Sequence, residues 1–135
     1  MKKLLSIKYS AGAVSAAMLV LRIGLGLLMM SHGYSKIIKF SDSKDTFMNF
    51  MGLGSTTSLV LVIFAEFFCS ILLILGLFTR LATIPLIITM LVVIINVAHL
   101  DFFNKGETAT LYLLSFITIL FIGPGRASVD GMIGK

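Results

Sequence analysis

Cysteine is almost absent from this 135-residue chain. Cys69 is the only one, and it lies inside an apolar run. An intramolecular disulfide, a CxxC redox pair and a zinc site built on several cysteines are therefore excluded. The sequence also lacks a haem-attachment motif, an iron–sulfur cysteine set and a dinucleotide-binding fingerprint. Any electrons that this chain handles must therefore come from a partner or a soluble donor.

Charged residues are also scarce, at 13% of the chain, whereas a typical soluble protein has roughly 25%. Apolar residues make up 58%. The composition excludes an ordinary soluble domain and indicates an integral membrane protein. The net charge of +5 does not indicate nucleic-acid binding, because the basic residues are scattered around the ends of the apolar runs.

Four long apolar runs predict an all-α fold, a four-transmembrane-helix bundle that forms a single integral membrane domain over residues 1–135. The expected spans cover about residues 11–30, 58–78, 81–100 and 108–122. Pro85 is expected in the first turn of the third span, where proline is tolerated. Gly24 and Gly26 are expected to allow close helix approach in the first span.

A polar loop over residues 31–57 separates the first two spans. Within it, SDSKDTFMNFMGLG predicts a short interfacial helix with Asp42 or Ser43 as its N-cap. Its Phe and Met side chains are expected at the membrane surface. A loop packed on the bundle is the alternative interpretation.

Four spans place both termini on one side of the membrane. Basic residues are more frequent on that side, which favours cytoplasmic termini. That side carries Lys2, Lys3, Lys8, Arg80, Arg126 and Lys135, and the opposite loops carry Lys36, Lys39, Lys44 and Lys105. The N-terminus resembles a signal peptide, but Lys8 interrupts its apolar run, so no cleavage is expected.

Arg22 and Glu66 are charged residues inside the first and second apolar runs. Counting from the span ends places both near the bilayer midplane, since a helix rises about 1.5 Å per residue. A charge at that depth is costly and needs a partner. We therefore predict that Arg22 and Glu66 pair or share a small polar cluster. Such a pair can fix helix packing or serve a functional site, and the sequence leaves both roles open.

A second polar group is expected where the spans meet the opposite membrane face. His32 and Lys36 are four residues apart at the end of the first span, Asn96 and His99 end the third, and Glu107 opens the fourth. These residues can bind an anion or exchange protons at neutral pH. Their irregular spacing does not indicate a metal site. Lys and His at span ends also commonly reach the lipid headgroups, which is the alternative.

The segments LRIGLGLLMMSHGYSK, AEFFCSILLILGLFTRLA, GETATLYLL and GPGRASVDGMI resemble the DoxX family of small bacterial membrane proteins. The resemblance extends over about residues 19–132. Besides Arg22, His32, Lys36 and Glu66, the matching residues form a structural motif of Gly76, Thr79, Arg80, Gly123, Pro124, Gly125, Arg126 and Asp130.

The resemblance implies a four-helix bundle in the cytoplasmic (inner) membrane and an association with redox processes. Some relatives are subunits of a thiosulfate:quinone oxidoreductase. The first hypothesis is therefore a redox-associated subunit that binds a quinone among its helices, with a redox protein as partner and no covalent cofactor. The alternative is a non-enzymatic membrane adaptor, and the third is a small-molecule or ion transporter acting as an oligomer. The sequence leaves open whether the chain is catalytic.

Overall fold

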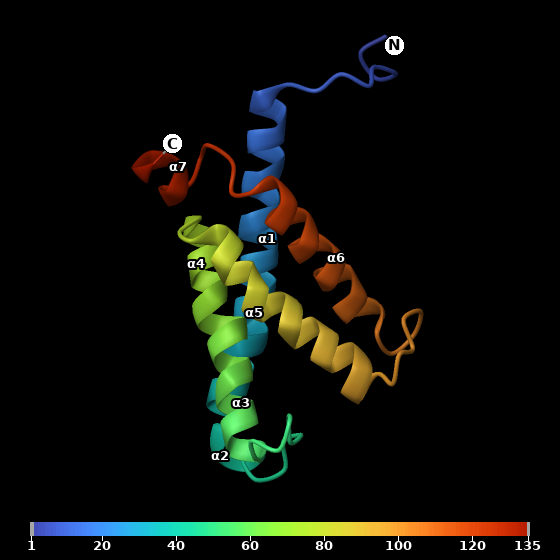
Figure 1. Ribbon diagram of the computed structural model, residues 1–135, viewed down its shortest axis with the longest axis vertical. Helices are drawn as coiled ribbons and strands as arrows, with labels where there is room; N and C mark the ends of the chain where they lie inside the picture. The colour runs from blue at the N-terminus through green and yellow to red at the C-terminus, as the bar shows by residue number, and fades with distance from the viewer. Residues whose placement is uncertain (1, 135) are drawn as a thin grey trace.

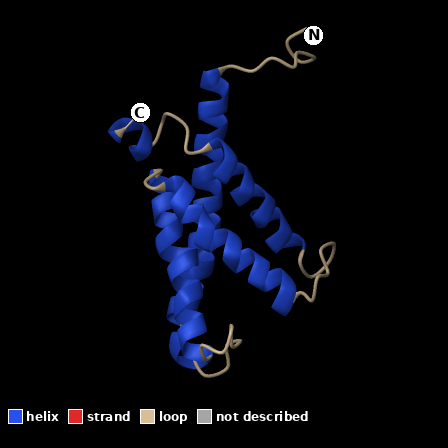
Figure 2. Cartoon of the chain, in the orientation of Figure 1, coloured by secondary structure: helices blue, strands red, loops and turns tan. Residues whose placement is uncertain are grey.

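The computed structural model describes residues 2–134 and contains only helices, turns and loops over that range (Figure 2). Three continuous helices are long and apolar enough to cross a membrane, namely Ala11–Ile38, Ser55–Leu75 and Thr79–Val97. The fourth apolar helix, Glu107–Ile122, has 16 residues, fewer than the roughly 20 that a perpendicular span requires. The chain is thus a helical, multi-pass membrane protein with three helices of spanning length.

The helical elements follow one another along the chain, with one π-helical segment inside the second long helix and another at the end of the third. They are α1 (Ala11–Ile38), α2 (Phe40–Ser43), α3 (Ser55–Ile63), η1 (Phe64–Cys69), α4 (Ser70–Leu75), α5 (Thr79–Val92), η2 (Val93–Val97), α6 (Glu107–Ile122) and α7 (Val129–Ile133). In Figure 1, α1 lies along the α3–η1–α4 helix, and α5 and α6 run beside each other at an angle to this pair.

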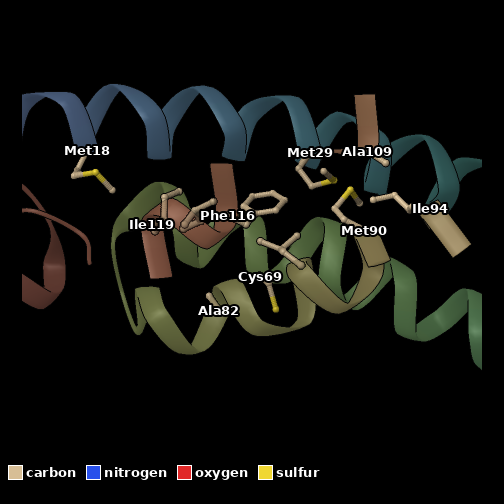
Figure 3. Close-up of a cluster of buried hydrophobic side chains, with 11 residues drawn as sticks. Met18, Met29, Cys69, Ala82, Met90, Ile94, Ala109, Phe116 and Ile119 are labelled. Atoms are coloured by element: carbon tan, nitrogen blue, oxygen red, sulfur yellow. The ribbon is translucent and has the colours of Figure 1, made fainter. Parts of the chain in front are cut away.

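A buried apolar cluster joins all four long elements (Figure 3). Phe116 and Ile119 of α6 are fully buried, as are Leu73 of α4 and Leu86 of α5. Large apolar side chains such as Leu111 on α6 are exposed on the outer surface. Since lipid is as apolar as these side chains, this surface suits contact with a bilayer.

Small residues set the distance between α1 and the second long helix. A Cβ atom on Gly33 would lie 2.8 Å from the backbone nitrogen of Phe67, and one on Gly26 would overlap the Ile74 side chain. The expected packing role is therefore found at Gly26, whereas Gly24 has no atom within 4 Å of the position where a Cβ would be. Gly33 provides the second close contact.

Several local predictions differ from the structure. The helix after α1 ends at Ser43, so Asp42 and Ser43 lie inside α2 and do not cap a helix running to residue 52. Helix α5 begins at Thr79, two residues before the predicted start of the third span, so Pro85 lies inside the helix and not in its first turn. Lys135, used in the orientation argument, lies outside the described residues.

Candidate functional site

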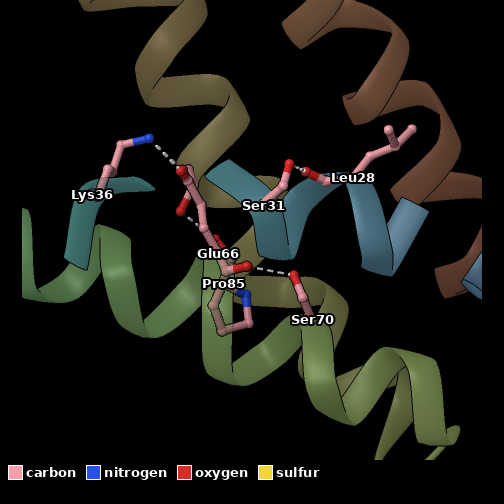
Figure 4. A network of polar contacts seen from close by, with 7 residues as sticks. Leu28, Ser31, Lys36, Glu66, Ser70 and Pro85 are labelled. Atoms are coloured by element: carbon pink, nitrogen blue, oxygen red, sulfur yellow. Dashed lines mark hydrogen bonds and ion pairs between the residues drawn. The ribbon is translucent and has the colours of Figure 1, made fainter. Parts of the chain in front are cut away.

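The buried carboxylate of Glu66 pairs with Lys36. Lys36 Nζ lies 2.6 Å from Glu66 Oε1 and 2.8 Å from Oε2, so it donates to both oxygens. The Glu66 side chain is 4% exposed and the Lys36 side chain 31% exposed. Figure 4 shows the lysine extending from the last turn of α1 toward the carboxylate on η1. The pair therefore has one buried member and one member that reaches the surface.

Glu66 lies on a π-helical turn, a distortion that is frequent at functional sites. The backbone N–H of Ser70 donates to Phe67 O. The Ser70 hydroxyl donates instead to Glu66 O at 2.7 Å, which satisfies that carbonyl (Figure 4). Gly33 brings α1 against this same turn. Ser70 thus provides a donor for a carbonyl of the wider π-helical turn. The close approach of α1 at Gly33 places this helix next to the Glu66 side chain.

A pocket of ≈ 220 Å³ opens beside the ion pair. His32, Lys36 and Glu66 contribute polar groups, together with Tyr112, whose ring meets His32 edge to face at a centroid distance of 6.1 Å. The remaining lining residues are Met29, Met90, Val93, Lys105, Thr108 and Ala109. The site is therefore a pocket between α1, η1, α5 and α6 whose lining combines apolar side chains with polar groups from several elements, a combination common in small-molecule sites.

The other three members of the predicted polar group lie outside this pocket. Asn96 is exposed, and its amide donates to Val92 O within its own helix. His99 is exposed in a turn with a φ of 51°. Glu107 is exposed beside a different, shallow pocket with Phe102 and Phe103. Only the α1 half of the predicted group is thus joined to the site.

The predicted Arg22–Glu66 pair is wrong. Arg22 is fully buried and donates from Nη1 to the carbonyls of Leu73 and Ile74, each at 3.3 Å, and from Nη2 to Ala127 O. Leu73 and Ile74 belong to the last turn of α4, where carbonyls run out of regular helical partners, although Leu73 O also accepts from the Gly76 N–H at 3.2 Å. Arg22 therefore caps α4, where a cation is also favoured by the helix dipole.

The depth estimate failed because the helices do not begin level with one another. The contacts of Gly33 with Phe67 and of Gly26 with Ile74 fix an antiparallel register. In that register Arg22 lies beside the end of α4, and α1 continues beyond this end toward its own N-terminus (Figure 1). Counting residues from the start of α1 therefore placed Arg22 too deep relative to Glu66.

Asp130 closes the N-terminus of α5 from the far end of the chain. Its Oδ1 accepts from the backbone N–H of Phe78 and its Oδ2 from that of Thr79, both at 2.9 Å. The Asp130 N–H in turn donates to Gly76 O at 2.9 Å. Partial burial raises the pKa of Asp130, but these two hydrogen bonds and the nearby Arg22 guanidinium more than offset it, so its pKa lies below the ordinary value.

Arg80 performs the corresponding role at the end of α6. Its Nη2 donates to the carbonyls of Phe121 and Ile122, at 3.3 and 3.4 Å. Gly123 follows with a φ of +93°, and a Cβ there would lie 3.2 Å from Arg80 Nη2. The structural motif is thus brought together at one end of the bundle, where Arg22, Arg80 and Asp130 satisfy backbone groups that lipid could not.

Sequence reasoning missed Tyr112 and Thr108 as pocket residues. They are four residues apart in the GETATLYLL segment, so they share a helix face and could have been grouped on that basis. It also missed the Lys36–Glu66 pair, although both residues were candidates. Within residues 2–134 no cluster of three or more His, Cys, Asp or Glu side chains is arranged to hold a metal ion.

Comparison with known proteins places the chain among membrane proteins of one family. The DoxX family profile matches residues 17–100. An uncharacterized protein of Haemophilus influenzae is 35% identical over 124 residues, which cover 85% of this chain and 89% of the relative. No solved structure matches the chain significantly.

Proposed function

The chain belongs to the DoxX family, and on this premise we propose that it is a redox-associated membrane subunit that binds a quinone head group beside Lys36 and Glu66. The single observation that carries the proposal is the ion pair that lines a pocket between the helices. A buried carboxylate inside a membrane protein is expensive to keep, and such groups commonly mark ligand or proton sites.

The polar wall offers the chemistry that a quinone head group requires. Quinone oxygens accept hydrogen bonds, and Lys36, His32 and Tyr112 carry donors. Reduction to the quinol consumes two electrons and two protons. Glu66 and His32 are positioned to pass protons to the pocket, since both side chains line it and both can exchange a proton. The electrons come from a redox partner, because the chain encodes no electron carrier.

The size and lining of the pocket also support this ligand class. At ≈ 220 Å³ it is smaller than the roughly 300–1,000 Å³ of sites for drug-sized ligands. A ring-sized head group suits this volume, and an isoprenoid tail remains outside among the apolar surfaces. Met29, Met90, Val93 and Ala109 supply the apolar walls. In this proposal α6 is the fourth membrane span. It lies against α5 and lines the pocket through Tyr112.

The test is mass spectrometry of organic extracts from the detergent-purified protein. We compare the parent with Lys36→Met and Glu66→Gln, and with Glu107→Gln as a control for loss of an exposed carboxylate outside the pocket. The proposal expects a quinone enriched over bulk lipid in the parent and in the control, and depleted in both pocket variants. Equal quinone content in all four folded proteins contradicts it and favours the membrane adaptor, for which co-purifying proteins are then sought.

A further inference from the structure

A second pocket, of ≈ 420 Å³, lies at the opposite end of the bundle from the one described above. It is formed where α4 turns into α5 and where the segment after α6 crosses that turn. Arg80, Arg126 and Asp130 line it together with the apolar side chains of Phe78 and Leu81. Neither the cap that Arg80 makes at the end of α6 nor the cap that Asp130 makes on α5 requires a pocket here.

The guanidinium donors in this pocket are only partly occupied by acceptors within the protein. Arg80 donates to carbonyls only through Nη2, and over residues 2–134 its other guanidinium nitrogens make no hydrogen bond. The Arg126 side chain likewise makes none over this range, although its backbone N–H is fixed by Ser15 Oγ at 2.9 Å. Both side chains are exposed. Both arginines line the pocket and keep guanidinium donors free. The Arg126 guanidinium lies near the start of α1, where its Nη2 would be 3.6 Å from a Cβ atom on Gly12.

The acidic residue offsets only one of the two positive charges. Both Asp130 oxygens accept from the backbone of α5, so the carboxylate is held by Phe78 and Thr79 and not by either of the pocket arginines. Arg80 and Arg126 thus leave the pocket with an excess of positive charge and with the planar donors that match phosphate oxygens.

The apolar part of the rim points to the kind of anion. Phe78 is 61% exposed and Leu81 is 66% exposed, and both border the pocket. They lie at the end of helices that traverse the membrane, so their side chains meet lipid close to the headgroup level. A free phosphate ion gains nothing from these residues, whereas a lipid presents a phosphate and an acyl chain together.

We propose that this pocket binds the phosphate headgroup of an anionic phospholipid, with Arg80 and Arg126 as the phosphate ligands and Phe78 and Leu81 against the adjoining acyl chain. Basic pockets between transmembrane helices are suited to such headgroups. The bound lipid holds the α4–α5 turn against the segment after α6, because Arg80 and Arg126 come from these two parts of the chain. The site is independent of the quinone proposal.

The test is native mass spectrometry of the protein released from nanodiscs of phosphatidylglycerol mixed with phosphatidylcholine. Arg126→Gln is the main variant, since the Arg126 side chain caps no helix. Lys8→Gln is the matched control, because it removes the same charge from an exposed residue outside the pocket. We expect the parent to retain phosphatidylglycerol selectively and Arg126→Gln to retain about tenfold less, as loss of a charge-assisted contact predicts. Lys8→Gln is expected to stay within about twofold of the parent.

Two further measurements separate the role of charge from that of guanidinium geometry, and a lipid from free phosphate. Arg126→Lys keeps the charge but loses the planar fork, so intermediate retention is expected. Inorganic phosphate at millimolar concentration is expected to leave the melting temperature of the parent unchanged. Equal retention of both lipids by the parent, or equal losses in Arg126→Gln and Lys8→Gln, overturns the proposal. Stabilisation by inorganic phosphate without lipid preference overturns the assignment to a lipid.

Discussion

Asp130 accepts a hydrogen bond from the backbone N–H of Thr79, a residue 51 positions earlier in the chain. It accepts a second from Phe78. Helices usually take such a cap from a side chain just before their first turn. Here Phe78 occupies that position and offers no acceptor in its side chain, so a carboxylate from a remote segment supplies the cap.

Replacing this carboxylate is expected to destabilise the fold. Asp130→Ala leaves both N–H groups without their acceptor, and loss of an N-cap costs about 0.5–2 kcal/mol. Thermal unfolding in detergent, followed by circular dichroism, measures the change. Asp45→Ala is the control, because Asp45 is exposed and accepts no hydrogen bond within residues 2–134. Equal melting temperatures for the parent and Asp130→Ala contradict the capping role.

The same carboxylate gives a defined pH dependence. Because its pKa is lower in the folded protein than in the unfolded chain, its contribution is fully present above the ordinary pKa of 3.8 and is lost as the pH falls through the lowered value. The gap in melting temperature between the parent and Asp130→Ala is therefore expected to be constant at neutral pH and to shrink below about pH 4. A gap that widens on acidification would refute this sign.

Gly76 is expected to tolerate no side chain. Its φ is +73°, and a Cβ atom there would overlap the guanidinium of Arg22. Gly52 has a similar φ of +75° with no atom within 4 Å, which makes Gly52→Ala the control for backbone strain alone. That strain costs about 1–2 kcal/mol. Gly76→Ala is expected to lose roughly 1–3 kcal/mol more, the usual range for overpacking. Unfolding of the two variants under the same conditions measures the difference, and equal losses argue against the contact.

Two glycines on α1 are expected to respond differently to the same substitution. Gly33→Ala forces α1 away from η1, because its Cβ would lie 2.8 Å from Phe67 N. A loss of about 1–3 kcal/mol is expected. Gly24→Ala meets no atom within 4 Å and improves helix propensity, so it is expected to be neutral or slightly stabilising. The pair is compared by thermal unfolding, and a loss in Gly24→Ala as large as that in Gly33→Ala would disprove the register.

Removing either member of the ion pair is expected to destabilise the fold, but by different amounts. Lys36→Met leaves the Glu66 carboxylate buried without a partner, whereas Glu66→Gln leaves a lysine that can reach solvent. Breaking a fully buried pair costs about 3–5 kcal/mol. The 31% exposure of the Lys36 side chain reduces this, so about 2 kcal/mol is expected for Lys36→Met and less for Glu66→Gln. The double variant is expected to recover most of the loss. Chemical denaturation measures all three, and a double variant no better than Lys36→Met contradicts the pairing.

The helical fold and the positions of the long helices could be predicted from the sequence because apolar runs of this length have few other solutions. The sequence also indicated Lys36 and Glu66 as candidates and grouped His32 with Lys36 through helix spacing. Assigning partners required the register between α1 and the second long helix. That register depends on close packing at Gly26 and Gly33, so it cannot be obtained by counting residues from the span ends.

The motif residues present a similar contrast. Gly76, Arg80 and Asp130 could be selected as a set through resemblance, but their role as caps could not. A cap supplied across 51 residues leaves no local pattern, since the signals for helix starts depend on neighbours in sequence. The same holds for Arg22, whose acceptors lie in α4 and in the segment before α7.

The C-terminal segment is needed to complete the contacts of helices that are synthesised before it. Residues 127–130 supply the acceptor for Arg22 and the cap for α5, yet a ribosome adds them after all the long helices have been made. Until then the Arg22 guanidinium lacks one acceptor, and the backbone N–H groups at the start of α5 lack their cap. A polypeptide that terminates before residue 127 therefore leaves the buried Arg22 guanidinium without its acceptor in this segment and α5 without its cap.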